Sequence, residues 1–195
     1  NDAFIQKVGQ FYIGSNNATL VDVHFEDSIL EFSHSSNDHG IYDPSQNTIG
    51  ANWQIDGLTF SNSTKVPVMH FLSNHGDMDN WTFTTYDINI SVAGSGADYD
   101  DVIKITNEWD VNLTFDGLSI SDPTRFGSSS TVQADKSLIY VLNTDNNFHL
   151  GIRNALFYNT PEHTAISATN NRITLSNVTI SDVYQPDDIY DWYEY

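Results

Sequence analysis

The chain has no cysteine, so neither disulfide bonds nor thiolate metal sites can stabilise its fold. It also has few basic residues: 7 Lys and Arg stand against 26 Asp and Glu, for a formal net charge of −19. Such an acidic surface repels polyanions, which argues against nucleic acid and anionic membranes as partners. No apolar run approaches the roughly 18 residues of a membrane span. The fold therefore depends on a core built from the hydrophobic residues, which make up 39% of the chain.

The abundant residue types indicate a β protein. Asp, Asn, Ser and Thr are frequent, and these residues favour turns and solvated strands over helix interiors. The length of 195 residues fits one domain. The sequence starts with Asn1 and not with Met, as expected of a mature chain after removal of a signal peptide or of a chain trimmed in another way. We therefore expect an extracellular protein, either secreted or held at the cell surface.

An internal repeat dominates the sequence. Six segments align without a gap: 20–27, 55–62, 83–90, 115–122, 152–159 and 175–182. Their first, fourth and sixth positions are apolar in every copy, which predicts that these side chains face inward; Tyr86 is among them. The third position is Asp, Asn or Gly in five copies and Thr85 in the remaining one. Asp, Asn and Gly tolerate a left-handed backbone, so each copy predicts two short strands that meet at a bend.

A further apolar strand precedes four of the aligned segments. These strands lie at 66–74, 101–107, 137–143 and 164–170. Three strands per turn predict an all-β, single-domain right-handed parallel β-helix of about six rungs, a β-solenoid that covers residues 17–182. The rungs at 52–62 and 170–182 resemble those of the pectin-lyase-like superfamily. This resemblance implies an architecture and no particular activity, because that superfamily contains enzymes, adhesins and non-catalytic surface repeats. An ordinary β-sandwich is the alternative fold.

The two ends of the chain are expected to cover the ends of the solenoid. In the N-terminal cap, residues 1–16, apolar side chains recur at helical spacing between Asp2 and Gly14, which predicts a short capping helix. A strand through 10–15 is the alternative. The acidic, aromatic C-terminal tail, residues 183–195, is expected to mediate self-association through the chain ends. The four tail residues with this expected role are Tyr190, Trp192, Tyr193 and Tyr195. Alternatively, the tail folds back over its own last rung.

No catalytic set emerges from the sequence. The second repeat position faces outward and places Asp116 and Arg153 on adjacent rungs, where a surface ion pair is the simpler interpretation. If the protein is an enzyme, Asp56, Asp116 and Arg153 are its best candidates. The seven His residues include no HExxH motif, so each is expected to be a surface or loop histidine with ordinary partners.

No cofactor is required, and calcium is the candidate ion. The loop carboxylates that suggest calcium are Asp77, Asp79, Asp98, Asp100 and Asp101. Turn formation and solubility are the alternative role of these residues. Six glycosylation sequons begin at Asn17, Asn62, Asn80, Asn89, Asn112 and Asn177. Those at Asn17, Asn80 and Asn112 fall at the same place before their repeats. A turn Asn beside a strand Thr explains that arrangement equally without a glycan.

Together these features predict a non-catalytic extracellular structural or adhesive β-solenoid, which is a candidate fibre or filament subunit and a candidate glycoprotein. The sequence favours a non-enzymatic role over an enzymatic one. The alternatives are a secreted polysaccharide lyase or glycoside hydrolase of the pectin-lyase-like group, and a glycan-binding module that uses exposed aromatics such as Trp109 or Tyr158. An extracellular glycan is thus a candidate partner, whereas nucleic acid and a membrane span are not expected.

Overall fold

The fold consists of parallel β-strands throughout the residues that the structure describes. The structure is a computed structural model, and the described residues are 3–6, 11–13, 17–34, 52–63, 67–73, 81–92, 101–107, 111–121, 137–143, 148–160, 164–169 and 172–183. The regular elements in these ranges are all strands, and none of them is a helix. The strands are β1 (Ala3–Gln6), β2 (Phe11–Ile13), β3 (Asn17–Val21), β4 (Val23–Glu26), β5 (Leu30–His34), β6 (Asn52–Asp56), β7 (Thr59–Ser63), β8 (Met69–Ser73), β9 (Trp81–Val92), β10 (Ile103–Asn107), β11 (Val111–Ser121), β12 (Ser137–Asn143), β13 (His149–Thr160), β14 (Thr164–Thr169) and β15 (Arg172–Val183).

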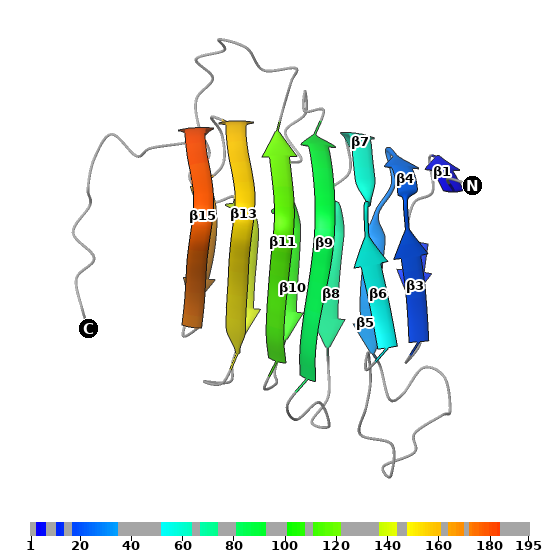
Figure 1. Cartoon of the computed structure of the whole chain (residues 1–195), viewed down its shortest axis with the longest axis horizontal. Helices are drawn as coiled ribbons and strands as arrows, with labels where there is room; N and C mark the ends of the chain where they lie inside the picture. The colour runs from blue at the N-terminus through cyan, green and yellow to red at the C-terminus, as the bar shows by residue number, and fades with distance from the viewer. Residues whose placement is uncertain are drawn as a thin grey trace, which may run out of the picture.

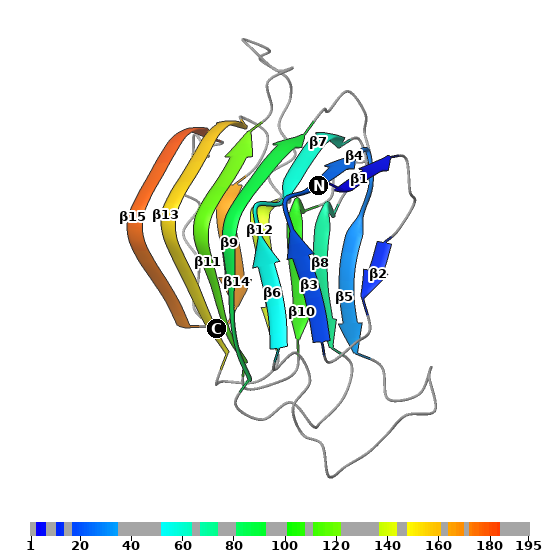
Figure 2. The ribbon, with the colours of Figure 1, turned by 45° about the vertical axis from the view of Figure 1, so that its right-hand side comes forward.

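Two parallel sheets face each other. Sheet A runs in the order β1-β4-β7-β9-β11-β13-β15, with β3 and β6 extending the lower half of its early strands (Figure 1). Sheet B runs β14-β12-β10-β8-β5-β2 and lies behind it (Figure 2). From β8 onward, consecutive strands alternate between the two sheets. Each strand therefore lies beside its counterpart in the next repeat, and the all-β, parallel prediction is confirmed.

A bend separates two arms in six repeats of sheet A. The four long strands pass through it at Asp87, Gly117, Asn154 and Asn177, whose φ values are 49°, 81°, 53° and 53°. In the earlier repeats Asp22 and Gly57, with φ of 53° and 67°, separate the two arms into distinct strands. We call these six residues the bend column. Their left-handed backbone costs least for Gly, Asn and Asp, which explains why the repeat uses these types here.

Glycine has a second role at two positions of the bend column. A Cβ on Gly57 would lie 2.5 Å from Oδ1 of Asp22, and a Cβ on Gly117 would lie 2.5 Å from Oδ1 of Asp87. Each glycine thus gives room to the aspartate of the preceding repeat. Close stacking of the repeats at the bend depends on this alternation of carboxylate and glycine.

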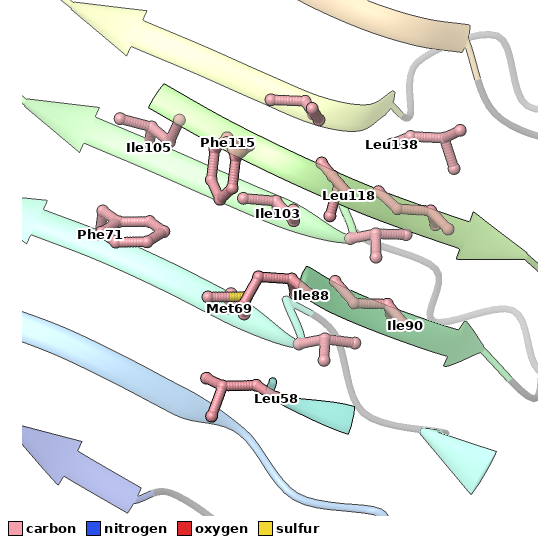
Figure 3. Close-up of a cluster of buried hydrophobic side chains, with 14 of the residues drawn as sticks. Leu58, Met69, Phe71, Ile88, Ile90, Ile103, Ile105, Phe115, Leu118 and Leu138 are labelled. Carbon is pink, nitrogen blue, oxygen red and sulfur yellow. The ribbon is translucent and has the colours of Figure 1, made fainter. Parts of the chain in front are cut away.

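The core lies between the two sheets. Met69, Phe71 and Ile103 of sheet B approach Phe115 and Leu118 of sheet A, as Figure 3 shows. Phe71 and Phe115 meet edge to face across the core, with ring centroids 6.0 Å apart. Within sheet A, like residues stack on each other: the Phe25 and Phe60 rings lie 4.8 Å apart and nearly parallel. Such stacking follows from the repeat, because equivalent positions face the same side in each strand.

The third copy of the repeat is shifted by two residues from its predicted alignment. Thr85, and not Phe83, pairs with Phe115 of the next repeat and with Ile55 of the preceding one. The bend residue of this copy is therefore Asp87, and the prediction of Thr85 at the bend was wrong. Tyr86, predicted to face the interior, is 45% exposed on the outer face. Segment 85–92 is the correct copy.

The predicted N-terminal helix is also wrong. Residues 3–6 and 11–13 form β1 and β2, which pair in parallel with β4 and β5. The alternative of a strand within 10–15 is correct at Phe11–Ile13. By contrast, the four additional apolar strands were located well from sequence, since they correspond to β8, β10, β12 and β14 of sheet B.

Candidate functional site

The outer face of sheet A carries a row of side chains next to the bend, and all of them except Val21 are polar. Strand pairing places its members side by side in the order Val21, Asp56, Tyr86, Asp116, Arg153 and Ser176. We call this row the polar column. It contains all three residues that the sequence nominated for catalysis. Tyr86 joined the row only through the corrected register, so sequence reasoning missed it.

Asp116 is bound on both of its carboxylate oxygens. Arg153 Nε lies 3.0 Å from Oδ2, and Asn154 Nδ2 donates to Oδ1 at 2.7 Å. Asn177 Nδ2 in turn donates to Oδ1 of Asn154 at 2.8 Å. These contacts link three adjacent strands, β11, β13 and β15. The Arg153 side chain is 49% exposed, so the ion pair itself contributes at most about 1 kcal/mol to stability.

Asp56 does not meet the other two candidates. Tyr86 on β9 lies between Asp56 on β6 and Asp116 on β11. Two strand spacings separate the backbones of the two aspartates, about 9.6 Å. Only Asp116 and Arg153 are brought together, and they contact each other. The geometry is that of an inter-strand ion pair flanked by an exposed tyrosine.

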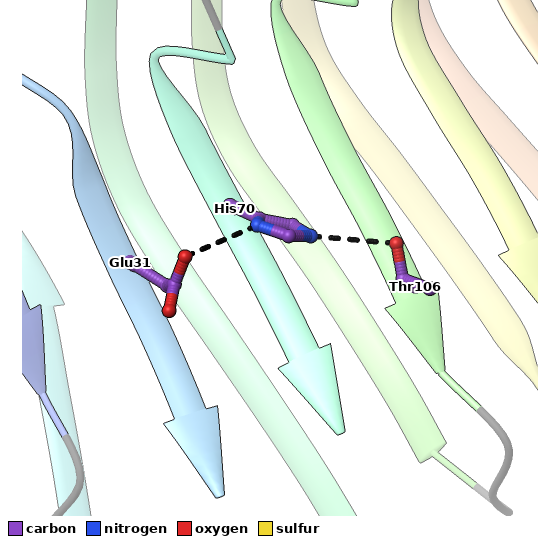
Figure 4. A network of polar contacts seen from close by, with 3 residues as sticks. All are labelled: Glu31, His70 and Thr106. Atoms are coloured by element: carbon purple, nitrogen blue, oxygen red, sulfur yellow. Dashed lines mark hydrogen bonds and ion pairs between the residues drawn. The ribbon is translucent and has the colours of Figure 1, made fainter. Parts of the chain in front are cut away.

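Sheet B carries a second polar cluster on its outer face. His70 on β8 bridges two neighbouring strands: Nδ1 lies 3.3 Å from Oε2 of Glu31 on β5, and Nε2 lies 3.4 Å from Oγ1 of Thr106 on β10 (Figure 4). Lys104 occupies the position of β10 that pairs with His70. Because a carboxylate accepts and does not donate, the tautomer that fits carries its hydrogen on Nδ1: Nδ1–H donates to Glu31, and Nε2 accepts from the Thr106 hydroxyl. The cluster therefore crosslinks three strands.

Hydroxyl partners are a common feature of the described histidines in strands. His24 Nε2 lies 3.0 Å from Oγ of Ser61, and His149 Nε2 lies 2.9 Å from Oγ1 of Thr174. His24 is also stacked on Phe4, with ring centroids 4.9 Å apart. Together with His70, these histidines bind across strands, in line with the expectation of ordinary partners. Aligning the strands of sheet B as well as those of sheet A would have found the Glu31–His70 pair.

Most of the predicted calcium residues lie outside the described residues, namely Asp77, Asp79, Asp98 and Asp100. Asp101 is buried, and its Oδ1 accepts a hydrogen bond from the backbone N–H of Ser137 at 2.9 Å. This contact fixes the start of β12. Within the described ranges, no three His, Asp or Glu side chains lie close enough together to hold a metal ion. Calcium binding stays a prediction.

Four of the six sequon asparagines have exposed side chains: Asn62, Asn89, Asn112 and Asn177. Asn80 lies outside the described residues, but Thr82 of the same sequon pairs with Asn112 and not with Thr114. The predicted alignment of the sequons at Asn80 and Asn112 was therefore wrong by two residues. Trp109 and the tail residues Tyr190, Trp192, Tyr193 and Tyr195 also fall outside the described residues, whereas Tyr158 is 39% exposed on β13.

Comparison with known proteins does not assign this chain to a family. No protein-family model matches the chain, and no match is found among curated proteins or solved structures. In the described part of the chain there is no helix long and apolar enough to cross a membrane.

Proposed function

We propose that the chain is a right-handed parallel β-helix of about six rungs with a structural or adhesive role outside the cell, and that it associates through its ends. The observation that carries this proposal is the use made of its best chemical groups. Asp116, Arg153 and Asn154 bind one another across adjacent strands, with both oxygens of the carboxylate occupied. A general acid or base needs an oxygen that faces substrate. These residues instead connect one repeat to the next.

The two parallel sheets and the repeated bend support the β-helical architecture. Strands that alternate between sheets, each beside its counterpart from the next repeat, are the arrangement expected of a solenoid. Such a molecule presents long, regular outer faces. For adhesion, Tyr86 and Tyr158 are exposed aromatic side chains on the outer face of sheet A, and they would contact an extracellular glycan.

The test compares catalysis with stability in one pair of variants. Purified wild-type protein is incubated with neutral and acidic polysaccharides, and the release of reducing ends and unsaturated uronides is measured. We expect no release. Asp116→Asn and Arg153→Ala should lower the melting temperature by roughly 2–4 °C, the shift that about 1 kcal/mol produces in a chain of this size. Cleavage by the wild type that is lost in Asp116→Asn would instead establish the polysaccharide-cleaving alternative.

The N-glycan part of the proposal has its own test. Expressed through a eukaryotic secretory pathway, the chain should carry N-glycans at exposed sequons, with Asn89 and Asn112 on the outer face of sheet A as first candidates. Digestion with an N-glycosidase would then reduce the mass of the wild type. The double variant Asn89→Gln/Asn112→Gln should show a smaller reduction. A secreted wild-type chain of unmodified mass would contradict the glycoprotein proposal.

A further inference from the structure

The strand β15 leaves apolar side chains uncovered. Leu175 and Ile180 are 49% and 42% exposed, whereas Ile152 and Phe157, their partners on β13, are 1% and 0% exposed. In the described part of the chain β15 is the last strand of sheet A and pairs on one side only, with β13. Within the described residues, the interior row of the repeat therefore continues onto β15, whose members lack the cover that each preceding repeat receives.

The β15 edge also lacks the features that usually block edge pairing. Exposed edges are commonly protected by short length, proline or charges in mid-strand. β15 has 12 residues, no proline, and charged residues only near its two ends, at Arg172 and Asp182. At the opposite end of the molecule, β1 and β2 have only 4 and 3 residues. The β15 edge is thus the more favourable of the two for pairing with another strand.

The pattern of β15 is complementary to itself. Its interior positions are Ile173 and Leu175 before the bend and Val178 and Ile180 after it, because the bend at Asn177 shifts the alternation by one residue. Read from either end, the sequence of interior and outer positions is the same. An antiparallel pair of two such strands can therefore set all four interior residues against interior residues.

We infer that β15 pairs with β15 of a second copy of this chain, antiparallel and about a two-fold axis, with Ile173 opposite Ile180 and Leu175 opposite Val178. On the outer face this register sets Thr174 opposite Thr179, a favourable cross-strand pair. It also places Arg172 opposite an uncharged residue, Ser181, so no like charges oppose each other. Each copy then covers the exposed interior row of the other, as expected for an isologous interface.

This inference rests on the proposal that the protein associates through its ends, and it names the partner and the register at one of them. A two-fold contact closes the end at which it forms, because no further copy can add to it. Association at the β15 end would therefore give dimers. A head-to-tail contact at the same edge would give open-ended assemblies.

Disulfide trapping tests the register in the full-length chain, which has no cysteine of its own. In Thr174→Cys/Thr179→Cys the two cysteines of one strand are about 16 Å apart, beyond disulfide reach, whereas each lies opposite a cysteine of the second copy. We expect oxidation to give a covalent dimer on non-reducing gels. A reductant should convert this dimer back to monomers. The single variants Thr174→Cys and Thr179→Cys should stay monomeric on the gel. The protein is produced in bacteria, so that the Asn177 sequon carries no glycan.

Other trapping results would overturn the inference. A dimer from Thr174→Cys/Ser181→Cys, with none from Thr174→Cys/Thr179→Cys, would show a register displaced by two residues. Crosslinked ladders of more than two chains would show that one β15 strand contacts more than one copy, which the two-fold pairing excludes. A wild-type chain that is monomeric by light scattering at tens of micromolar would remove the interface altogether, and with it the proposed association at this end.

Two further variants separate the β15 edge from other modes of association. Leu175→Arg should halve the mass measured by light scattering and leave the circular dichroism spectrum unchanged, because Leu175 is already half exposed. Deletion of residues 184–195 from the variant Thr174→Cys/Thr179→Cys should preserve the disulfide between positions 174 and 179 of the two copies. If deletion abolishes association and no crosslink forms in the full chain, association through the ends survives and the β15 register is wrong.

Discussion

The Thr85 hydroxyl is a polar group in an apolar place. Thr85 occupies the interior row between Ile55 and Phe115 and is fully buried, and its Oγ1 has no hydrogen-bond partner among the described residues. A buried hydroxyl without a partner costs about 1–3 kcal/mol. Its two neighbours in the row, Ile55 and Phe115, are large apolar residues that cannot pair with the hydroxyl.

Thr85→Val should therefore stabilise the protein by about 1 kcal/mol, because valine keeps the shape of threonine and removes the unpaired hydroxyl. Urea denaturation with a two-state fit measures the change in the free energy of unfolding. Thr84→Val, on the outer face of the same strand, is the matched control and should alter stability by no more than about 0.5 kcal/mol. A clear loss of stability in Thr85→Val would indicate that the hydroxyl has a partner after all.

Thr85 also marks the point at which sequence reasoning went wrong by two residues. A large apolar residue at the first repeat position favoured Phe83, but the structure accepts Thr85 there and places Asp87 at the bend. The bend imposes a stricter condition than the core, because few residue types adopt positive φ whereas many apolar residues fill a row. Weighting Asp87 above Phe83 would have given the correct register, and with it Tyr86 in the polar column.

At the scale of a strand, the bend of β11 depends on Gly117. Its φ of 81° disfavours any residue with a Cβ, and that Cβ would lie 2.5 Å from Asp87 Oδ1 and 3.2 Å from the Asp87 backbone nitrogen. Gly117→Ala should destabilise the protein by about 2 kcal/mol or more, from backbone strain and from displacement of the neighbouring strand. Thermal unfolding monitored by circular dichroism provides the measurement.

Gly151→Ala is the control for this prediction. A Cβ at Gly151 would lie 2.8 Å from Oγ1 of Thr114, a side-chain atom that can rotate away, and Gly151 has no positive φ. We expect a smaller loss of stability than in Gly117→Ala. Equal losses in the two variants would mean that crowding, and not the left-handed backbone, sets the cost at the bend.

The strands at the N-terminus illustrate why element type could not be derived there. Phe4, Ile5, Val8, Phe11 and Tyr12 have helical spacing, yet residues 3–6 and 11–13 are strands. Pairing of β1 with β4 and of β2 with β5 provides the edges of two existing sheets, a tertiary contact that outweighs local spacing. By contrast, four strands of sheet B were predicted well, because their apolar segments recur along the chain and each recurrence supports the assignment of the others as strands. The Glu31–His70–Thr106 cluster was missed because its members are far apart in sequence.

At the scale of the whole molecule, the stacked interior rows should make the fold intolerant of a buried charge. Phe60 is fully buried and stacked on Phe25. Phe60→Asp should cost several kcal/mol and unfold the protein at room temperature or close to it. Loss of the β-sheet circular dichroism signal and of a cooperative melting transition are the expected observations.

The control for Phe60→Asp lies two residues away. Asn62 is exposed at a positive φ of 50°, and Asp27 of the preceding repeat also has positive φ, 46°. Asn62→Asp adds the same charge at a position where aspartate is compatible with the backbone, so it should melt within a few degrees of the wild type. If both variants melt like the wild type, Phe60 does not support the core as the structure implies.

The bend column also sets how the molecule would respond to mechanical load. Its residues are separated along the chain by 35, 30, 30, 37 and 23 residues, and in the described part of the chain each strand is hydrogen-bonded to its counterparts in the adjoining repeats. A force that pulls the two termini apart along the stack would detach the repeats from the ends, one after another. Since an extended residue spans about 3.3–3.6 Å, each detachment would lengthen the tether by about 80–130 Å. In an optical trap the unequal step lengths would identify which repeat yields first.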